Sequence, residues 1–451
     1  MSRLVPLASA VLLACSSNAV PDGGSPLDAI MIVDASRDSG ADAGWPACPA
    51  QAPQVGGTTA TDALADAPAR CGAPAYAWLR DATLGDVVSR EVTERYRAAE
   101  LSAIAAAAGV TLPAAPEHAV RIERMVYVTQ DRGRHVQSST VLAYPSDVRT
   151  RAGQPILLFL HVTSGFTRGC GPTGDAASRL LTAVIASYGW IVAAPDYLGL
   201  ESAGDDYAPL HPYLVGEAAA LVSLDAARAA VRAIASDGGA LCAEPRVAVL
   251  GGSQGGHAAL WVDRLAPYYA RELEPIGTVA TVPPSDLVAQ AERSLTEIVD
   301  ATAATMGMLA THPSWYGAPA RIGEALVSPW DVDLPAALDA SCDPGSALSL
   351  PAALADVFTA SLLDAAAAGT FAGVDPFGCY ARQNGLTSTD VPRIGPSSPS
   401  YGILFVLGEN DTLVHTPIER AAYDTLCAAG LPLTYLECAG ASHTGATAWA
   451  L

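Results

Sequence analysis

Six short runs of apolar residues recur along the last two-thirds of the chain, and helical segments separate most of them. The runs are PILLFLHV (155–162), WIVAAPDYL (190–198), RVAVLGG (246–252), IGTVATV (276–282), YGILFVLG (401–408) and PLTYLEC (432–438). Continuous apolar runs of this length indicate strands that are buried on both faces. Segments such as GEAAALVSLDAARAAVRAIAS (216–236) have the composition of helices between them. The pattern therefore predicts an α/β protein, with a mostly parallel sheet flanked by helices.

The pattern differs in three other regions. Residues 47–118 are Ala-rich, and we expect a helical region there. The runs RIERMVYVT (121–129) and QSSTVLAYP (137–145) predict two strands joined by a hairpin loop. Residues 286–396 separate two predicted strands by more than a simple crossover needs, which indicates an inserted helical cap or lid. The core of the fold would then comprise residues 119–285 and 397–451.

The N-terminus has the layout of an export signal. Residues 1–15 (MSRLVPLASAVLLAC) contain one arginine and an apolar run that is too short to span a bilayer. The ending LLAC resembles a bacterial lipobox, in which Cys15 would be lipidated; a signal peptide cleaved elsewhere is the alternative. Residues 16–46 are rich in Asp, Gly, Ser, Ala and Pro, which is typical of a flexible tether. We expect an exported protein held at the outer membrane or cell surface, or else secreted.

Charge and cysteine content exclude several classes of function. The formal net charge of −21 argues against nucleic-acid binding, and all 25 basic residues are arginines, which excludes Schiff-base chemistry and a phosphate-binding P-loop. Eight cysteines remain after Cys15, and an even number in an exported chain suggests disulfides rather than free thiols. The chain contains neither CxxC nor HExxH, so no metal and no cofactor are expected.

The stretch VAVLGGSQGGHA (247–258) contains the pattern G-x-S-x-G through Gly251, Ser253 and Gly255. It lies where a predicted strand ends and a predicted helix begins. That context is typical of a nucleophile elbow, in which a strained turn exposes the serine; a tight turn with no catalytic role is the alternative. Ser253 is therefore the candidate nucleophile.

A nucleophilic serine needs a base, and the base needs an acid that orients it. His443 follows the last predicted strand in CAGASHTGAT, and Asp411 follows the preceding strand in FVLGENDTLV. The chain order Ser253, Asp411, His443 is expected when all three lie at one edge of a parallel sheet.

Other residues compete for these roles. His257 lies one helical turn beyond the serine and would have to bend back to reach it, so we expect a packing role. Glu409 is a rival acid, and His415 is a weaker rival base.

Two backbone N–H groups are expected to form an oxyanion hole. Gln254 follows the nucleophile at the start of its helix and supplies one donor. The loop HVTSG (161–165) should supply the second, and Thr163 is the candidate there.

A different ligand is suggested by GCGPTG (169–174), a literal G-x-G-x-x-G through Gly169, Gly171 and Gly174. Asp196 follows at the end of the next predicted strand, as in a dinucleotide-binding fingerprint. The glycines begin several residues after the strand, and Pro172 stiffens a turn whose N–H groups would have to face a pyrophosphate. Both features argue against the dinucleotide hypothesis.

The segments APDYLGLES, HPYLVGEAAALVSLDAARAA and GGSQGGHAALW resemble the secretory lipase family of α/β hydrolases, of the lipase-A type. The resemblance extends from about residue 120 to the end of the chain. It implies an α/β-hydrolase fold with a helical lid, ester hydrolysis without metal or cofactor, and the roles of nucleophile, acid and base for Ser253, Asp411 and His443. It also implies a disulfide between Cys170 and Cys342. Family members often have HGTTG where this chain has HVTSG, so Val162 replaces a glycine.

The sequence thus predicts an exported serine carboxylester hydrolase, a lipase or esterase that acts on lipid or short-chain acyl esters. Its only expected partners are a small-molecule ester and, through the lipidated N-terminus, a membrane. A serine peptidase with the same triad and a non-catalytic ligand-binding lipoprotein are alternatives. Acyl chain length and oligomeric state do not follow from the sequence.

Overall fold

The computed structural model describes residues 15–16, 70–148, 150–237, 241–395 and 400–449. A ten-stranded sheet has the order β1-β10-β9-β8-β7-β5-β6-β4-β3-β2. The strands are β1 (Cys15–Ser16), β2 (Val87–Tyr96), β3 (Val120–Asp131), β4 (Arg134–Pro145), β5 (Thr150–Leu160), β6 (Ile191–Pro195), β7 (Leu241–Gly252), β8 (Glu274–Thr281), β9 (Ile403–Gly408) and β10 (Leu433–Cys438). The six strands from β10 to β6 are parallel to one another, which confirms the predicted mostly parallel sheet.

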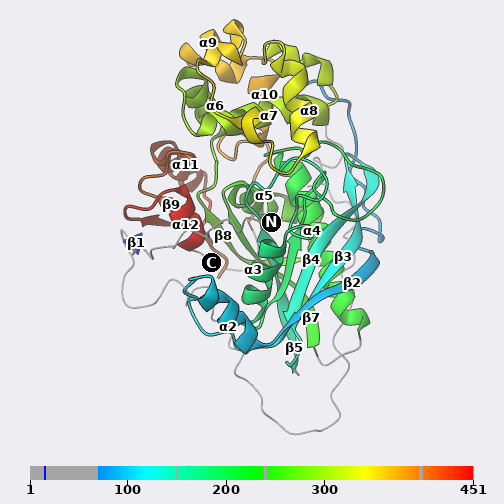
Figure 1. Cartoon of the computed structure of the whole chain (residues 1–451). Coiled ribbons are helices and arrows are strands. Elements are labelled where there is room, and N and C mark those ends of the chain that lie inside the picture. The colour runs from blue at the N-terminus through cyan, green and yellow to red at the C-terminus, as the bar shows by residue number, and fades with distance from the viewer. Residues whose placement is uncertain (1–14, 17–69, 149, 238–240, 396–399, 450–451) are drawn as a thin grey trace.

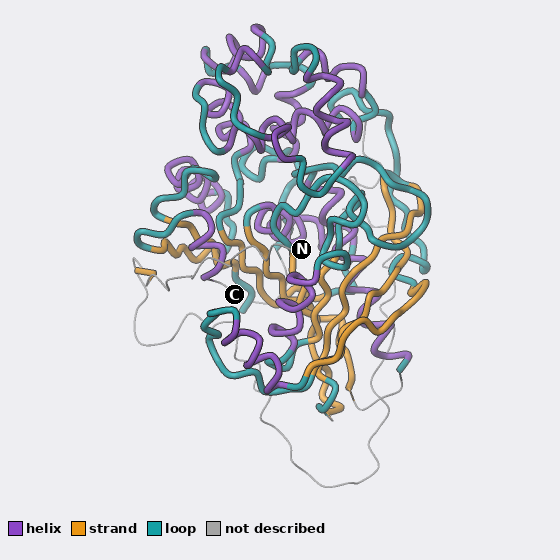
Figure 2. The backbone as a smooth tube through the Cα atoms, viewed as in Figure 1, coloured by secondary structure: helices purple, strands orange, loops and turns teal. Residues whose placement is uncertain are grey.

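Helices cover both faces of this sheet (Figure 2). They are α2 (Ala98–Ala107), α3 (Ala176–Ala186), α4 (Gly216–Ser236), α5 (Gln254–Tyr269), α11 (Thr416–Ala428) and α12 (His443–Trp449). Alternate residues of β5 belong to different hydrophobic clusters: Leu158 packs with residues of α4 and α5, whereas Leu157 packs with residues of α2 and α3. The continuous apolar runs are therefore explained, because both faces of each central strand are buried.

A hairpin joins β3 to β4, as predicted. The two strands pair from Val120 with Pro145 to Asp131 with Arg134. Arg132 and Gly133 form the two-residue turn, with φ of 48° and 74°. Two successive positive φ angles produce the turn twist that suits a hairpin.

The prediction of a helical region over residues 47–118 is wrong for one segment that the structure describes. Within the described part of this region, residues 70–118, Val87–Tyr96 form the ten-residue edge strand β2 and Ala98–Ala107 form the one α-helix. Most side chains of β2 are exposed, and two of its charged residues pair with the neighbouring strand, Arg90 with Glu123 and Glu91 with Arg124. An exposed edge strand lacks the apolar alternation that identifies strands in sequence.

A second layer, built from α6 to α10, lies above the carboxyl edge of the parallel strands (Figure 1). Its helices are α6 (Leu287–Thr296), α7 (Ala301–Trp315), α8 (Trp330–Ala340), α9 (Ala360–Ala367) and α10 (Phe377–Asn384). These helices fall within residues 286–396, the predicted cap or lid. We refer to them as the lid helices.

Disulfides join this layer to distant parts of the chain. Cys170 is bonded to Cys342, the pairing that the family resemblance implied, and Cys71 is bonded to Cys379. Cys427 is free and exposed, which corrects the expectation that all eight remaining cysteines form disulfides. Its helix α11 ends at the surface, where a thiol can stay unpaired.

The predicted signal peptide (1–15) and tether (16–46) lie outside the described residues, except for Cys15 and Ser16 of β1. In the part of the chain that is described, no helix combines the length and apolar character needed to cross a membrane.

Candidate active site

The unit that carries GGSQG is a strand, a one-residue turn and a helix. Ser253 alone separates β7 from α5, with φ 55° and ψ −117°, a strained conformation for a residue with a side chain. A Cβ on Gly255 would lie 1.9 Å from the carbonyl oxygen of Leu160, and one on Gly251 would lie 2.1 Å from that of Gly255. Both glycines are needed because other backbone passes too close for a side chain.

Ser253, Asp411 and His443 meet at one edge of the sheet. β7, β8 and β9 are parallel neighbours, and β10 extends the same set. Ser253 follows β7, Asp411 follows β9, and His443 begins α12 shortly after β10. The carboxyl ends of parallel strands lie at the same edge, which is why residues far apart in sequence come together there.

A continuous chain of hydrogen bonds connects these three residues. His443 Nε2 lies 2.9 Å from Ser253 Oγ, and His443 Nδ1 lies 2.7 Å from Asp411 Oδ2. The other oxygen of Asp411 accepts the N–H groups of Leu413 and Val414, at 3.0 and 2.9 Å. Asp411 is thus fixed as an acceptor. Nδ1 of His443 therefore carries the proton, and Nε2 is left to accept the serine hydroxyl.

The rival residues lie in other environments. Burial lowers the pKa of His257 to about 4, and its Nε2 lies 2.8 Å from the carbonyl oxygen of Asn384. Glu409 accepts the backbone N–H of Gly440 at 2.6 Å. Nδ1 of His415 is buried and forms no hydrogen bond with any residue in the described ranges. None of the three contacts Ser253 through its side chain in the described structure.

Gln254, the first residue of α5, is held by a buried histidine. Its side-chain nitrogen lies 2.7 Å from Nε2 of His211, whose Nδ1 lies 2.7 Å from the carbonyl oxygen of Leu198. Burial lowers the pKa of His211 to about 3, so its ring is neutral at ordinary pH. His211 therefore donates from Nδ1 to Leu198 and accepts from Gln254, which ties the loop after β6 to the elbow.

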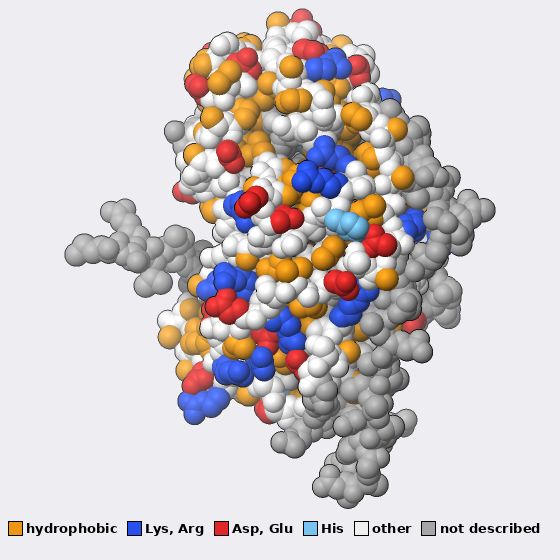
Figure 3. Space-filling view, turned by 90° about the vertical axis from the view of Figure 1, so that its right-hand side faces the viewer, with side chains coloured by type: hydrophobic (Ala, Val, Ile, Leu, Met, Phe, Trp, Pro, Cys, Tyr) orange, Lys and Arg blue, Asp and Glu red, His pale blue; other side chains and the backbone are white. Residues whose placement is uncertain are grey.

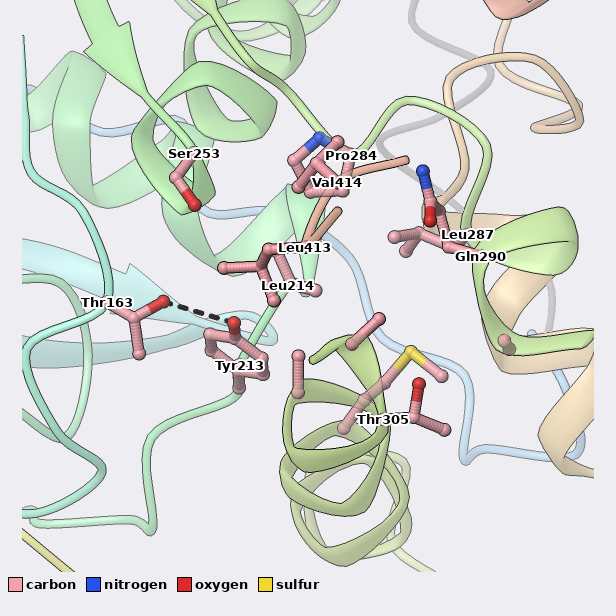
Figure 4. Close-up of a pocket in the computed structure, with 14 residues that line it drawn as sticks. Thr163, Tyr213, Leu214, Ser253, Pro284, Leu287, Gln290, Thr305, Leu413 and Val414 are labelled. Atoms are coloured by element: carbon pink, nitrogen blue, oxygen red, sulfur yellow. Dashed lines mark hydrogen bonds between the residues drawn. The ribbon is translucent and has the colours of Figure 1, made fainter. Parts of the chain in front are cut away.

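The loop after β5 brings Thr163 to the same edge. Thr163 Oγ1 lies 3.1 Å from the hydroxyl of Tyr213, as the dashed line in Figure 4 marks. The positive φ in this loop belongs to Gly165, at 143°. Val162 is not a positive-φ residue, so its branched side chain causes no strain there.

Ser253 and Thr163 line a small cavity with mostly apolar walls (Figure 4). Its volume is about 70 Å³. Two lid helices contribute to it, α6 and α7. The other lining residues are Tyr213, Leu214, Pro284, Leu287, Gln290, Ala291, Ala301, Ala304, Thr305, Met308, Leu413 and Val414.

The side chain of Asp196 occupies the space beside the glycine-rich loop 169–174. Asp196 is buried and accepts the backbone N–H of Thr173 at 2.8 Å as well as the Thr173 hydroxyl. A Cβ on Gly171 would lie 2.4 Å from Asp196 Cβ. The glycine makes room for this carboxyl group, so Asp196 is directed at its own loop and not at a nucleotide ribose.

Among the residues that the structure describes, no three His, Cys, Asp or Glu side chains gather in a way that could hold a metal ion.

Comparisons with known proteins indicate the class of protein to which this fold belongs. Residues 176–311 match the family model described as Secretory lipase, which confirms the resemblance drawn from the sequence. No curated protein matches the sequence. The fold resembles the rice cell wall degrading esterase LipA from Xanthomonas oryzae, with TM-score 0.65 at 22% identity over 81% of this chain and 94% of that one. It also resembles Candida antarctica lipase A in its closed state, with TM-score 0.59 at 15% identity over 80% and 78% of the two chains.

The fold is thus that of the α/β hydrolases. With the family match, it confirms the prediction of a carboxylic ester hydrolase.

Sequence alone does not identify His211, Tyr213 and Leu214 as residues of this site. All three lie in the run HPYLVGE, one of the segments that resemble the secretory lipase family, and that resemblance is the one signal that could have pointed to them. Leu214 has a φ of 57°, and such a backbone outlier beside a nucleophile has no signature in sequence.

Proposed function

We propose that the chain is an exported serine carboxylester hydrolase in which Ser253 is the nucleophile, His443 the general base and Asp411 the residue that orients the imidazole. The observation that carries the proposal is the hydrogen-bond chain from Ser253 through His443 to Asp411, which starts on a strained turn beside a cavity. A serine and a histidine without a shared catalytic role would not require this chain of hydrogen bonds on a strained turn.

Each group has a defined task in the proposed reaction. Ser253 Oγ attacks the ester carbonyl carbon while its proton moves to His443 Nε2. The tetrahedral intermediate collapses, the alcohol leaves with the proton from His443, and an acyl-enzyme remains. Water then attacks the acyl carbon with His443 again as base, and the carboxylic acid is released. Asp411 stays ionised throughout and stabilises the imidazolium.

The oxyanion would be stabilised by the backbone N–H of Gln254 and by Thr163. The number of hydroxyl protons available supports a role for the Thr163 hydroxyl itself as a donor to the oxyanion. Thr163 and Tyr213 together carry two hydroxyl protons, and only one of these is used in the bond between them. Neither hydroxyl has another partner in the described chain, so one proton can be donated to a group beside Ser253.

The walls of the cavity support an acyl group as the part of the substrate that enters. The aliphatic side chains of Leu214, Leu287 and Met308 offer no partner to a charged group. At about 70 Å³ the space is less than half of the roughly 150 Å³ that holds one benzene molecule. Short acyl groups would therefore fit with small adjustments, and longer lipid chains would require the lid helices to move.

Labelling with a fluorophosphonate tests the nucleophile. The purified full-length protein should form one adduct, located at Ser253 by mass spectrometry, and should hydrolyse p-nitrophenyl esters. Ser253→Ala should form no adduct and lose roughly 10⁵–10⁶-fold in kcat. Ser164→Ala is the matched control in the neighbouring loop and should keep both properties.

The same samples separate the alternatives. An adduct together with cleavage of p-nitroanilides in preference to esters would favour a peptidase. Absence of an adduct on folded protein would overturn the hydrolase proposal and favour a binding protein.

Export and lipidation at Cys15 are part of the proposal. The apolar segment and LLAC ending support them. Cys15→Ala should move the protein from the membrane fraction to the soluble fraction and remove the lipid adduct from the N-terminal peptide. An unchanged distribution would contradict the anchor.

A further inference from the structure

A second cavity opens where the β3–β4 hairpin meets the end of α7, and it shares no lining residue with the cavity beside Ser253. Its volume is about 350 Å³. Arginine and aromatic side chains form much of its lining, including Tyr76, Asp131, Arg132, Arg134, Tyr207 and Trp315. Figure 3 shows this side of the molecule, where basic side chains gather beside a hollow. Because the chain contains no lysine, these side chains are arginines. We call this cavity the arginine hollow.

Two guanidinium groups stack on aromatic rings in the arginine hollow. The guanidinium carbon of Arg132 lies 5.5 Å from the centre of the Trp315 ring, and that of Arg134 lies 4.9 Å from the centre of the Tyr207 ring. Arg132 lies in the tight hairpin turn and Arg134 directly follows it, so their backbone is fixed as well. Stacking leaves the edge of a guanidinium group, where its N–H donors lie, free for other partners.

The two arginines differ in what their donors reach. Arg132 donates to Asp131, to the hydroxyl of Tyr207 and to the carbonyl oxygen of Trp315. The side chain of Arg134 forms no hydrogen bond or ion pair with any residue in the described ranges. Within the described residues, the hollow therefore presents one oriented cation whose guanidinium donors have no partner.

The charge of the arginine hollow is opposite to that of the whole chain. Its lining contains three arginines, Arg70, Arg132 and Arg134, and one acidic residue, Asp131. The chain as a whole has a formal net charge of −21. Arg70 is paired with Glu217 and Arg132 with Asp131, so the positive charge of Arg134 is left without an acidic partner among the described residues and favours an anion at this place.

We propose that the arginine hollow binds a carboxylate carried on a six-membered ring. The planar fork of Arg134 matches a carboxylate in a two-point hydrogen bond. The ring of Tyr76, which also lines the hollow, offers flat apolar surface to the ring that carries it. Aromatic acids and sugar acids share this chemistry. The proposed site does not involve Ser253, so it stands apart from ester hydrolysis.

Calorimetric titration of the full-length protein tests this site with two acids, 4-hydroxybenzoate and galacturonate. Their neutral counterparts, 4-hydroxybenzyl alcohol and galactose, are run alongside. We expect saturable binding of at least one acid, and at least tenfold weaker binding of its neutral counterpart. Arg134→Gln should weaken binding of the acid about tenfold or more, because it removes the charged donor pair. Arg134 is exposed, so the melting temperature should not change.

Arg97→Gln is the matched control. Arg97 is also exposed, and among the described residues its side chain pairs with Glu100 on α2, away from the arginine hollow, so its variant should bind the acid like the wild type. The proposal is overturned if neither acid saturates the wild type, or if Arg134→Gln binds as well as the wild type. An acid that bound beside Ser253 instead, as a reaction product would, should bind Arg134→Gln as well as it binds the wild type. The Arg134→Gln variant therefore distinguishes the two sites.

Discussion

Two glycine-rich loops follow strands and precede helices in this chain, yet their glycines serve different purposes. At the elbow, Gly251 and Gly255 make room for backbone, and the side chain of Ser253 remains directed at the cavity. In loop 169–174, Gly171 makes room for the buried carboxyl group of Asp196. A glycine-rich pattern therefore indicates that other atoms approach the backbone closely. Whether the loop is structural or reactive depends on which group approaches it.

The carboxyl groups near the two loops differ as well. Asp411 accepts two backbone N–H groups and the imidazole of His443. Glu201, which lies under loop 169–174, accepts one backbone N–H, and its Oε2 has no partner in the described structure. Burial raises the pKa of Glu201 to about 8. Changes at the elbow edge should thus affect catalysis, and changes under loop 169–174 should affect folding.

Among the changes that test this comparison, Asp411→Asn should have the largest effect on catalysis. The amide cannot stabilise the imidazolium and favours the wrong tautomer of His443, so kcat should fall by roughly 10³–10⁴-fold. The melting temperature is measured alongside to show that the fold persists. Glu409→Gln is the control, because Glu409 contacts the backbone of Gly440 instead of His443. Equal losses in both variants would contradict the assignment of the acid.

Removing the Thr163 hydroxyl should have the next largest effect. Thr163→Val keeps the shape of the side chain and should lower kcat by roughly 10²-fold, with little change in KM, as expected for a donor that acts on the oxyanion. Thr163→Ser should restore most of the rate. Tyr213→Phe, which removes only the partner of that hydroxyl, should cost less than Thr163→Val. A wild-type kcat in Thr163→Val would limit the role of Thr163 to its backbone.

The sequence predicts the parallel core and the order of Ser253, Asp411 and His443 because continuous apolar strands and the loops after them leave local signatures. It does not predict β2, whose exposed, charged surface carries no such signature. The contact between His211 and Gln254, residues 43 positions apart, depends on how two loops pack, and so does the stacking of Arg134 on Tyr207. Tertiary packing creates these features.

Under loop 169–174, Asp196→Ala should act on stability. The change leaves the backbone N–H of Thr173 and the hydroxyl of Ser139 without their acceptor in a buried place, which should cost about 2–3 kcal/mol of unfolding free energy. Urea unfolding measures this loss. The kcat of the folded fraction should stay within about threefold of the wild type. A drop comparable to that of Asp411→Asn would show that the two loops are not separable.

Glu201→Gln should have the smallest effect on kcat, within about twofold, and it should reveal the ionisation state of the buried carboxyl group. The unfolded chain releases this proton near pH 4.5, whereas the folded chain keeps it until about pH 8. Between these values the unfolded state holds fewer protons than the folded state, so the wild type loses stability as the pH rises. Glutamine mimics the neutral carboxyl group and has no proton to lose. The variant should therefore gain stability over the wild type from about pH 4.5 upward, reaching roughly 2–5 kcal/mol above pH 8. Urea unfolding of both proteins at pH 4.5, 6 and 8 measures the difference.

Glu100→Gln, at an exposed helix position where the pKa of Glu100 is lowered by Arg97, should show no such gain. A difference that stays constant from pH 5 to pH 8 would mean that Glu201 is ionised in the folded protein. The region under loop 169–174 would then hold a charge, and its contrast with the elbow edge would be lost.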